Sequence, residues 1–225
     1  MKFDIEFSPD FSMLTVGLDS GESIVAESGA MVSMTGKVDI KTAARGGVLS
    51  SLKRKVLGGE SIFQNTFTAS ENAQHVTFSP PVMGALERYE LAGGELLLQS
   101  KAYLASTTDV ELDTKWEGVK GFFGGNGLFL LKVKGTGSLF FNTYGAVHPI
   151  EVSGSYVVDT GHIVAFEPSL TYRVKKVGGF KSLFLSGEGL VCEFEGQGKV
   201  WVQTRKPGRL AEFLHPFRPV KAKKD

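Results

Sequence analysis

Hydrophobic and polar residues alternate with a period of two through most of the chain between its glycines. Around residues 190–195, for example, Leu190, Cys192 and Phe194 occupy every second position, and Glu193 and Glu195 lie on the opposite face. Because successive side chains of a strand point to opposite faces, this pattern predicts short β-strands with one buried face. The chain has 28 glycines and only 8 prolines, so we expect tight turns and an all-β, antiparallel sandwich or barrel.

A two-part motif occurs three times in the same order along the chain. The earlier part lies at residues 26–32, 98–104 and 158–164, and the later part lies at 58–66, 135–143 and 196–204. Ordered self-similarity of this kind predicts one supersecondary unit used three times, with approximate three-fold internal symmetry. We expect a single domain over 1–225, with repeats at about 1–79, 80–147 and 148–206.

Each repeat contains a glycine-bounded insertion between its two motif parts. The first, 47–57, has the spacing of a short amphipathic helix, whereas 121–127 and 178–187 are rich in glycine and aromatic residues. One interpretation is that these insertions fold back on the core of the chain. The other is that they form an apolar end that contacts a second subunit or a membrane surface. The candidate interface residues are Phe122, Phe123, Phe180, Leu183 and Phe184.

The segment after the third repeat has a pattern of its own. Residues 208–215 predict a short helix that ends before Pro216, and Leu210, Phe213 and Leu214 are expected to dock it. The basic residues at 220–225 predict a solvated tail rather than an arm that binds nucleic acid, because so few charges bind phosphate weakly.

Charge and cysteine content exclude several classes of protein. Lys and Arg total 25 against 24 Asp and Glu, so the chain has no overall field that attracts nucleic acid, and a nucleic-acid partner is not expected. No apolar stretch is long enough for a transmembrane segment, and the N-terminus lacks a signal-peptide pattern, which predicts a cytoplasmic protein. A single cysteine, Cys192, excludes an internal disulfide framework, and its alternation predicts a buried thiol.

Motifs for catalysis, metal binding and nucleotide binding are absent from the sequence. The four histidines have no metal-ligand spacing, and there is neither a phosphate-binding loop nor a Gly-x-Ser-x-Gly nucleophile motif. We therefore predict no catalytic residue, no cofactor and no metal site, and we expect that the protein is not an enzyme.

Two sets of polar residues recur at equivalent positions of the motif. They are Glu27, Gln99 and Asp159 in the earlier part, and Asn65, Asn142 and Gln203 in the later part. Three-fold symmetry can gather such side chains around a cation or a polar ligand. The favoured alternative is that they satisfy backbone hydrogen bonds at strand ends. His162 joins the candidate ligand-binding residues because Asp159 precedes it by three positions and can orient its ring as a weak acid–base pair.

The motifs at 21–31, 59–65, 125–128, 159–162 and 196–198 together resemble the altered-inheritance-of-mitochondria family, also described as mitochondrial biogenesis proteins. The resemblance runs from about Phe3 to Arg205. It implies a fold of the trp RNA-binding attenuation protein superfamily, a variant of the double-stranded β-helix. It also implies a link, through mitochondrial relatives, to inner-membrane organisation, and it transfers no catalytic residue. The repeated Lys, Glu and Phe positions of the RNA-binding namesake have no match here.

These observations favour a non-enzymatic assembly or scaffold protein that forms a homo-oligomer, with a membrane-proximal protein as a further partner. The first alternative is a module that binds a small ligand or a metal through the polar repeat positions. The second alternative is an RNA-binding module.

Overall fold

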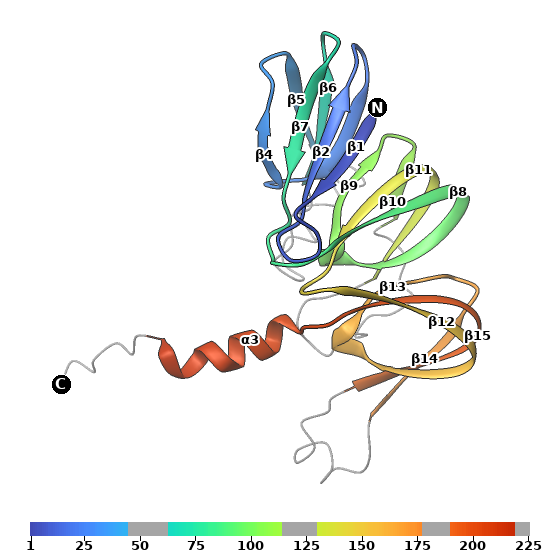
Figure 1. The fold of residues 1–225 in the computed structure, drawn as a ribbon. Helices are drawn as coiled ribbons and strands as arrows, with labels where there is room; N and C mark the ends of the chain where they lie inside the picture. The colour runs from blue at the N-terminus through green and yellow to red at the C-terminus, as the bar shows by residue number, and fades with distance from the viewer. Residues whose placement is uncertain (45–62, 114–129, 177–189, 219–225) are drawn as a thin grey trace, which may run out of the picture.

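The computed structural model describes residues 1–44, 63–113, 130–176 and 190–218. This part of the chain is almost entirely antiparallel β-structure in two sheets, with a single α-helix near the C-terminus. Four strands form one sheet in the order β1-β2-β7-β4, and eleven strands form the other. The all-β prediction is confirmed, and Figure 1 shows three successive groups of strands followed by a helix that projects from them.

The elements fall into three segments along the chain. The first comprises β1 (Lys2–Glu6), β2 (Met13–Leu18), β3 (Ser23–Glu27), β4 (Met31–Met34), β5 (Val38–Ala44), β6 (Phe63–Ala69) and β7 (Gln74–Phe78). The second comprises β8 (Leu86–Gln99), the 3-10 turn η1 (Ser100–Ala102), β9 (Tyr103–Thr107), β10 (Val110–Asp113) and β11 (Leu130–Asn142). The third comprises β12 (Val147–Asp159), η2 (Thr160–His162), β13 (Ile163–Phe166), β14 (Thr171–Lys176) and β15 (Leu190–Gln203). α3 (Pro207–Leu214) and η3 (His215–Phe217) follow.

The second and third segments share one pairing scheme. The long strand β11 pairs with β8, β9 and β10, and the long strand β15 pairs in the same way with β12, β13 and β14. In the first segment two shorter strands replace each long one: β2 and β3 correspond to β8, and β6 and β7 correspond to β11. β3 and β5 pair with β6, while β2 and β4 pair with β7. The order of pairing is therefore common to all three segments, and a three-fold rotation that relates them stays a prediction.

Neighbouring segments are joined by strand pairing in one repeated register. Ala26 of β3 pairs with Ala105 of β9, and Leu98 of β8 pairs with Ala165 of β13. Ala26 and Leu98 directly precede Glu27 and Gln99, the equivalent polar residues of the earlier motif. Their partners Ala105 and Ala165 are the third residues of β9 and β13. We call these two contacts the internal junctions. They link the segments into a continuous eleven-stranded sheet.

The pairing corrects the alignment of the later motif in the first repeat. Residues 135–143 and 196–204 form the second halves of β11 and β15, but the supposed counterpart at 58–66 leads into β6. Asn65 in β6 pairs with Ala26, just as Leu131 near the start of β11 pairs with Leu98. Asn142, in contrast, lies at the end of β11. The counterpart of the second half of β11 is β7, so Asn65 is not equivalent to Asn142 and Gln203.

Alternating residues of the strands pack into three hydrophobic clusters, approximately one for each segment. In the third cluster the ring of Phe166 packs edge-on against Phe194 at 5.0 Å and against Tyr172 at 5.1 Å. Cys192 lies in the same cluster with no exposed surface, which confirms the buried position predicted from alternation.

Burial gives a testable property to the Cys192 thiol, because removal from water raises its pKa from 9.0 to about 12. We expect the thiol to react with a disulfide reagent at pH 8 only after unfolding, since roughly one in ten thousand folded molecules then carries the thiolate. Above pH 9 the unfolded thiol loses its proton while the folded thiol keeps it, so the free energy of unfolding falls as pH rises. A thiol titration with and without urea measures the reactivity. Rapid labelling of the folded protein would contradict the burial.

Several predicted features lie outside the described residues. These are the amphipathic insertion 47–57, the insertions with Phe122, Phe123, Phe180, Leu183 and Phe184, and the basic tail 220–225. The C-terminal helix is present at Pro207–Leu214, but the docking prediction is wrong because none of its residues is buried. Among the described helices, none has the length and hydropathy needed to cross a bilayer.

Candidate functional site

Among the described strands, two at opposite ends of the fold lack the partner strand that their counterparts have. β4 is the last strand of its sheet and corresponds to β9 and β13, each of which pairs with the preceding segment at an internal junction. β12 is the first strand of the larger sheet, and its C-terminal half corresponds to β3 and to the C-terminal half of β8. Within the part of the chain that the structure describes, no strand pairs with the outer edge of β4 or β12.

Side chains on β4 and β12 are more exposed than their counterparts on the paired strands of the internal junctions. On β12, Val157 is 54% exposed, whereas its counterpart Leu97 at an internal junction is 4% exposed. On β4, Met34 is 37% exposed, whereas its counterparts Ser106 and Phe166 are buried. Apolar side chains are exposed at these two edges, where no described strand takes the place of the segment that covers their counterparts. We call the edges of β4 and β12 the open edges.

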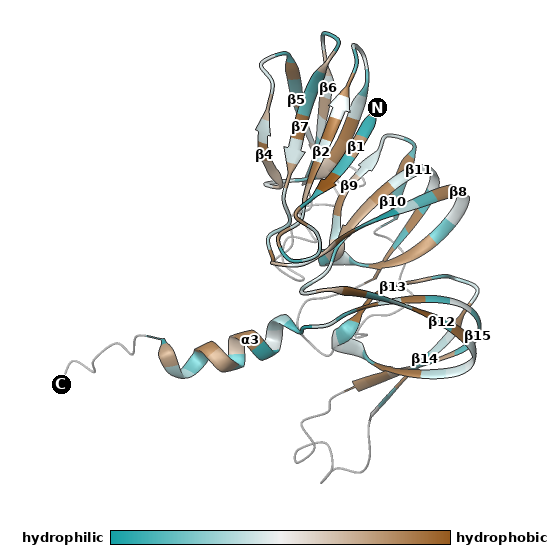
Figure 2. Ribbon diagram, in the orientation of Figure 1, coloured by the Kyte–Doolittle hydropathy of each residue, from teal (hydrophilic) through white to brown (hydrophobic). Residues whose placement is uncertain are grey.

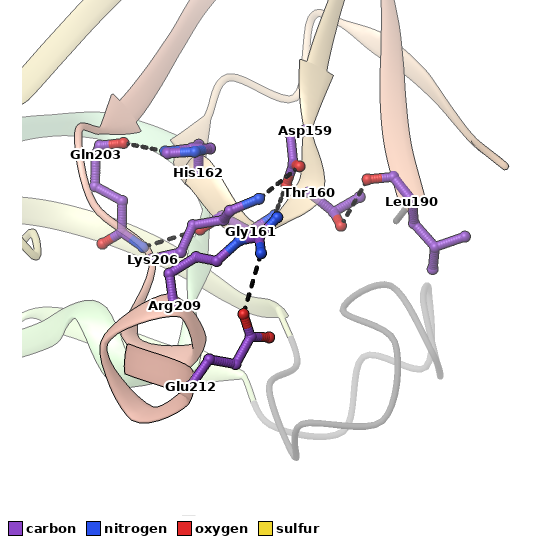
Figure 3. Close-up of polar contacts among 9 residues, drawn as sticks. All are labelled: Asp159, Thr160, Gly161, His162, Leu190, Gln203, Lys206, Arg209 and Glu212. Carbon is purple, nitrogen blue, oxygen red and sulfur yellow. Dashed lines mark hydrogen bonds and ion pairs between the residues drawn. The ribbon is translucent and has the colours of Figure 1, made fainter. Parts of the chain in front are cut away.

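A cluster of polar contacts lies at the C-terminal end of β12, beside its open edge (Figure 3). Asp159 accepts a hydrogen bond from the backbone N–H of Gly161 at 2.8 Å through Oδ1. Its Oδ2 forms an ion pair with Lys206 Nζ, also at 2.8 Å, and both side chains are about four-fifths buried. Because Lys206 directly precedes α3, this pair fixes the start of the helix to the turn after β12.

The same turn is tied to the end of β15 by Gln203. Its side chain donates from Nε2 to the carbonyl of Gly161 at 3.1 Å and accepts the backbone N–H of Tyr144 at 2.9 Å. His162 Nδ1 lies 2.6 Å from the backbone carbonyl oxygen of Gln203. Figure 3 shows the imidazole directed to Gln203 and the carboxylate directed to Gly161 and Lys206, and the predicted Asp159–His162 pair stays a prediction. These contacts hold the backbone of the turn in place.

The other candidate ligand-binding residues do not converge with Asp159. Glu27, Gln99 and Asp159 end β3, β8 and β12, which are three steps apart in the order β12-β15-β13-β8-β11-β9-β3. Strands lie about 4.8 Å apart, so neighbouring members of the set are separated by roughly 14 Å across the sheet. Over the described ranges, no group of three or more His, Cys, Asp and Glu side chains is placed to hold a metal ion. These positions end equivalent strands, and Gln99 is 5% exposed.

The ion pair at this turn gives a prediction for stability. Replacing Asp159 by Asn keeps the size of the side chain and removes the charge that Lys206 binds, so we expect a loss of about 1–3 kcal/mol in the free energy of unfolding. Urea denaturation measures this loss, and faster tryptic cleavage after Arg205 would report a loosened start of α3. The matched control is Glu212→Gln, which breaks an exposed pair with Arg209 and should change stability by less than about 0.5 kcal/mol. Equal effects of both substitutions would contradict the structural role of Asp159.

Comparison with known proteins places these features in a family. An uncharacterised protein from Streptococcus pyogenes serotype M6 is 27% identical over 228 residues, which cover 97% of this chain and 92% of the relative. The crystal structure of a Streptococcus pyogenes protein superposes with a TM-score of 0.77 at 25% identity, covering 96% of this chain and 99% of that one. The sequence profile of the family described as mitochondrial biogenesis AIM24 matches residues 3–205. That match spans all three segments and ends just before α3, so the chain belongs to the mitochondrial biogenesis AIM24 family.

Proposed function

We propose that this protein is a non-enzymatic assembly module that forms a homo-oligomer by pairing β4 of one copy with β12 of the next. The observation that carries the proposal is the repeated internal junction. The chain already makes this antiparallel contact twice, between β3 and β9 and between β8 and β13, and ends with one half of the same contact at each open edge. A second copy supplies the missing half.

The internal junctions also give the register of the contact between copies. Leu98 meets Ala165 and Leu97 meets Phe166 at the second junction. Transferred to the open edges, the same register sets Val158 opposite Ser33 and Val157 opposite Met34. Pairing in this register covers the exposed apolar side chains and satisfies the outer backbone groups of both strands, as in other cases of strand addition.

The contact joins two different surfaces, so it is heterologous. Such contacts generate a closed ring when the rotation from copy to copy closes, and a filament when it does not. A single exposed edge of this length is otherwise a site of uncontrolled aggregation, and exposed edge strands are normally covered or charged in proteins that stay monomeric. Residues 155–158 of β12 carry no charge to prevent pairing.

The test is an absolute mass by light scattering over a dilution series, followed by amide hydrogen exchange on the same samples. We expect a whole multiple of 24.3 kDa at high concentration, with slow exchange at residues 31–34 and 155–158 that becomes fast when dilution yields the monomer. A monomer at every concentration overturns the proposal. An oligomer in which both open edges exchange rapidly overturns it too, because the copies then associate through another surface.

A further inference from the structure

Each internal junction has a second part besides its strand pairing, and this part lies where the segments begin. Ser12, just before β2, donates its N–H to the carbonyl of Gly84. Ala85, just before β8, donates its N–H to the carbonyl of Gly145 in the same way. Isolated bridges join Phe11 to Gly84 and Gly84 to Gly145. The start of each segment is therefore held by the start of the segment that follows it.

At the third segment, residues 204–206 occupy the place of a following segment start. Ala146, just before β12, donates its N–H to the side-chain Oγ1 of Thr204 at 3.0 Å. The carbonyl of Ala146 accepts the N–H of Thr204 at 3.1 Å, and the carbonyl of Tyr144 accepts the N–H of Arg205 at 3.2 Å. A hydroxyl group of the same copy thus replaces the carbonyl that a following segment supplies at the internal junctions. We call residues 204–206 the end cap.

An ion pair ties the end cap to the open edge of β12. Lys206 Nζ lies 2.8 Å from Oδ2 of Asp159, the last residue of β12 (Figure 3). α3 follows the end cap and has no buried residue. Figure 1 shows this helix leaving the sheets, and Figure 2 shows hydrophobic and hydrophilic residues interleaved along it. Release of the end cap therefore takes no α3 side chain out of the core.

We infer that the end cap is an autoinhibitory contact, which the next copy displaces when it joins β12. The inference rests on the proposed assembly through the open edges and adds its regulation. In the register of the internal junctions, Phe11 of the next copy takes the position that Gly84 and Gly145 hold in theirs. Its carbonyl then accepts the Ala146 N–H, which Thr204 accepts in the single copy. A backbone N–H is a single donor, so the end cap and the next copy compete for it.

This competition makes the affinity between copies depend on how often the end cap is released. Only a copy with a released end cap offers both parts of the junction, so the apparent dissociation constant equals the intrinsic constant divided by the released fraction. The Asp159–Lys206 pair is charge-assisted, and both side chains are about four-fifths buried. Breaking this pair raises the released fraction and strengthens assembly, although the single copy becomes less stable.

The test replaces Lys206 by Met in the full-length chain, which keeps a long side chain and removes its charge. Light scattering over a dilution series should show assembly at about tenfold lower concentration than for the unmodified chain, because a hydrogen bond to a charged group shifts an equilibrium by about this factor. The matched control is Arg209→Met, which removes the same charge from an exposed pair with Glu212 and should shift the concentration by less than about twofold. Adding Met34→Lys to Lys206→Met should restore the monomer, because the gain acts through the open edges.

Amide hydrogen exchange on the same samples reports the displacement itself. In the single copy the N–H groups of Thr204 and Arg205 are bonded to carbonyls of the third segment. We expect these two amides to exchange faster when copies join, whereas residues 31–34 exchange more slowly. Slower exchange of both sets on assembly would show that the end cap stays in place, and would overturn the inference.

Further results separate the end cap from the assembly. If the unmodified chain assembles and Lys206→Met leaves its association unchanged or weaker, the end cap does not inhibit and the open-edge contact stands. An equal gain with Arg209→Met assigns the effect to net charge and overturns the inference. A gain that persists with Met34→Lys overturns it too, because the copies then join through another surface. A monomer at every concentration for the unmodified chain and all variants removes the assembly and the inhibition together.

Discussion

Replacing Met34 by Lys, or Val157 by Glu, is expected to convert the assembled protein into a 24.3 kDa monomer. Each position is exposed on an open edge of the isolated copy, so a charge there leaves the fold intact. At the proposed contact between copies the same charge would be buried opposite an apolar side chain, which costs several kcal/mol when it has no partner. Because about 1.4 kcal/mol corresponds to a tenfold change, we expect association to weaken by roughly a hundredfold or more. Light scattering measures the loss.

The decisive control is the chain that carries both substitutions. Its introduced lysine meets the introduced glutamate of the next copy, so the charges pair and the oligomer should return. Ile40→Lys provides a second control, because Ile40 is 41% exposed on β5, which lies outside both internal junctions and both open edges. It should leave the mass unchanged. Failure of the double variant to restore assembly would show that Met34 and Val157 do not face each other.

The largest loss of stability is expected from Phe194→Ala. Phe194 has no exposed surface, packs on Phe166 at 5.0 Å, and lies in the middle of β15, between β12 and β14. Removing a buried phenyl ring leaves a cavity and costs about 3–5 kcal/mol, a large share of the stability of a typical domain. Urea denaturation of the dilute protein gives the change.

Phe213→Ala is the matched control for this prediction, because the same side chain is 67% exposed there. Its effect on the dilute protein should stay within about 0.5 kcal/mol. A small effect of Phe194→Ala would mean that the third hydrophobic cluster collapses around the missing ring, and a crystal structure of the variant would show the shift of Phe166.

Alternation and glycine content were sufficient to predict the class of the fold, but glycine alone misplaced one motif. Gly137 and Gly198 lie at close contacts, where a side chain on Gly137 would collide with Thr107 and one on Gly198 with Ser169. The corresponding turn of the first segment, at residues 70–73, contains no glycine, and Ala73 adopts a positive φ of 57° instead. Because the nearest glycine pair of the first segment is Gly58-Gly59, the sequence motif matches residues 58–66, and Asn65 falls at the position of Asn142.

The open edges illustrate a different limit of sequence patterns. Met31, Val32 and Met34 have the hydrophobic character of Tyr103 and Leu104 in the equivalent strand. Their exposure depends on whether another strand pairs with β4, and none of the described strands does; a pattern along one chain does not record this. The polar cluster is similar: the spacing placed His162 near Asp159, but Lys206, 47 positions after Asp159, takes the carboxylate. Contacts between distant parts of the chain decide such pairs.

The difference between the two open edges gives each copy a direction. In the proposed assembly, a copy that carries only Met34→Lys still offers a normal β12 to a partner, so we expect it to join one neighbour and reject the other. Mixed in small amounts with the unmodified protein, it acts as a chain terminator and shortens every assembly that it enters. In a cell that expresses both forms, we expect such a substitution to be dominant over the normal copy although its own fold is intact.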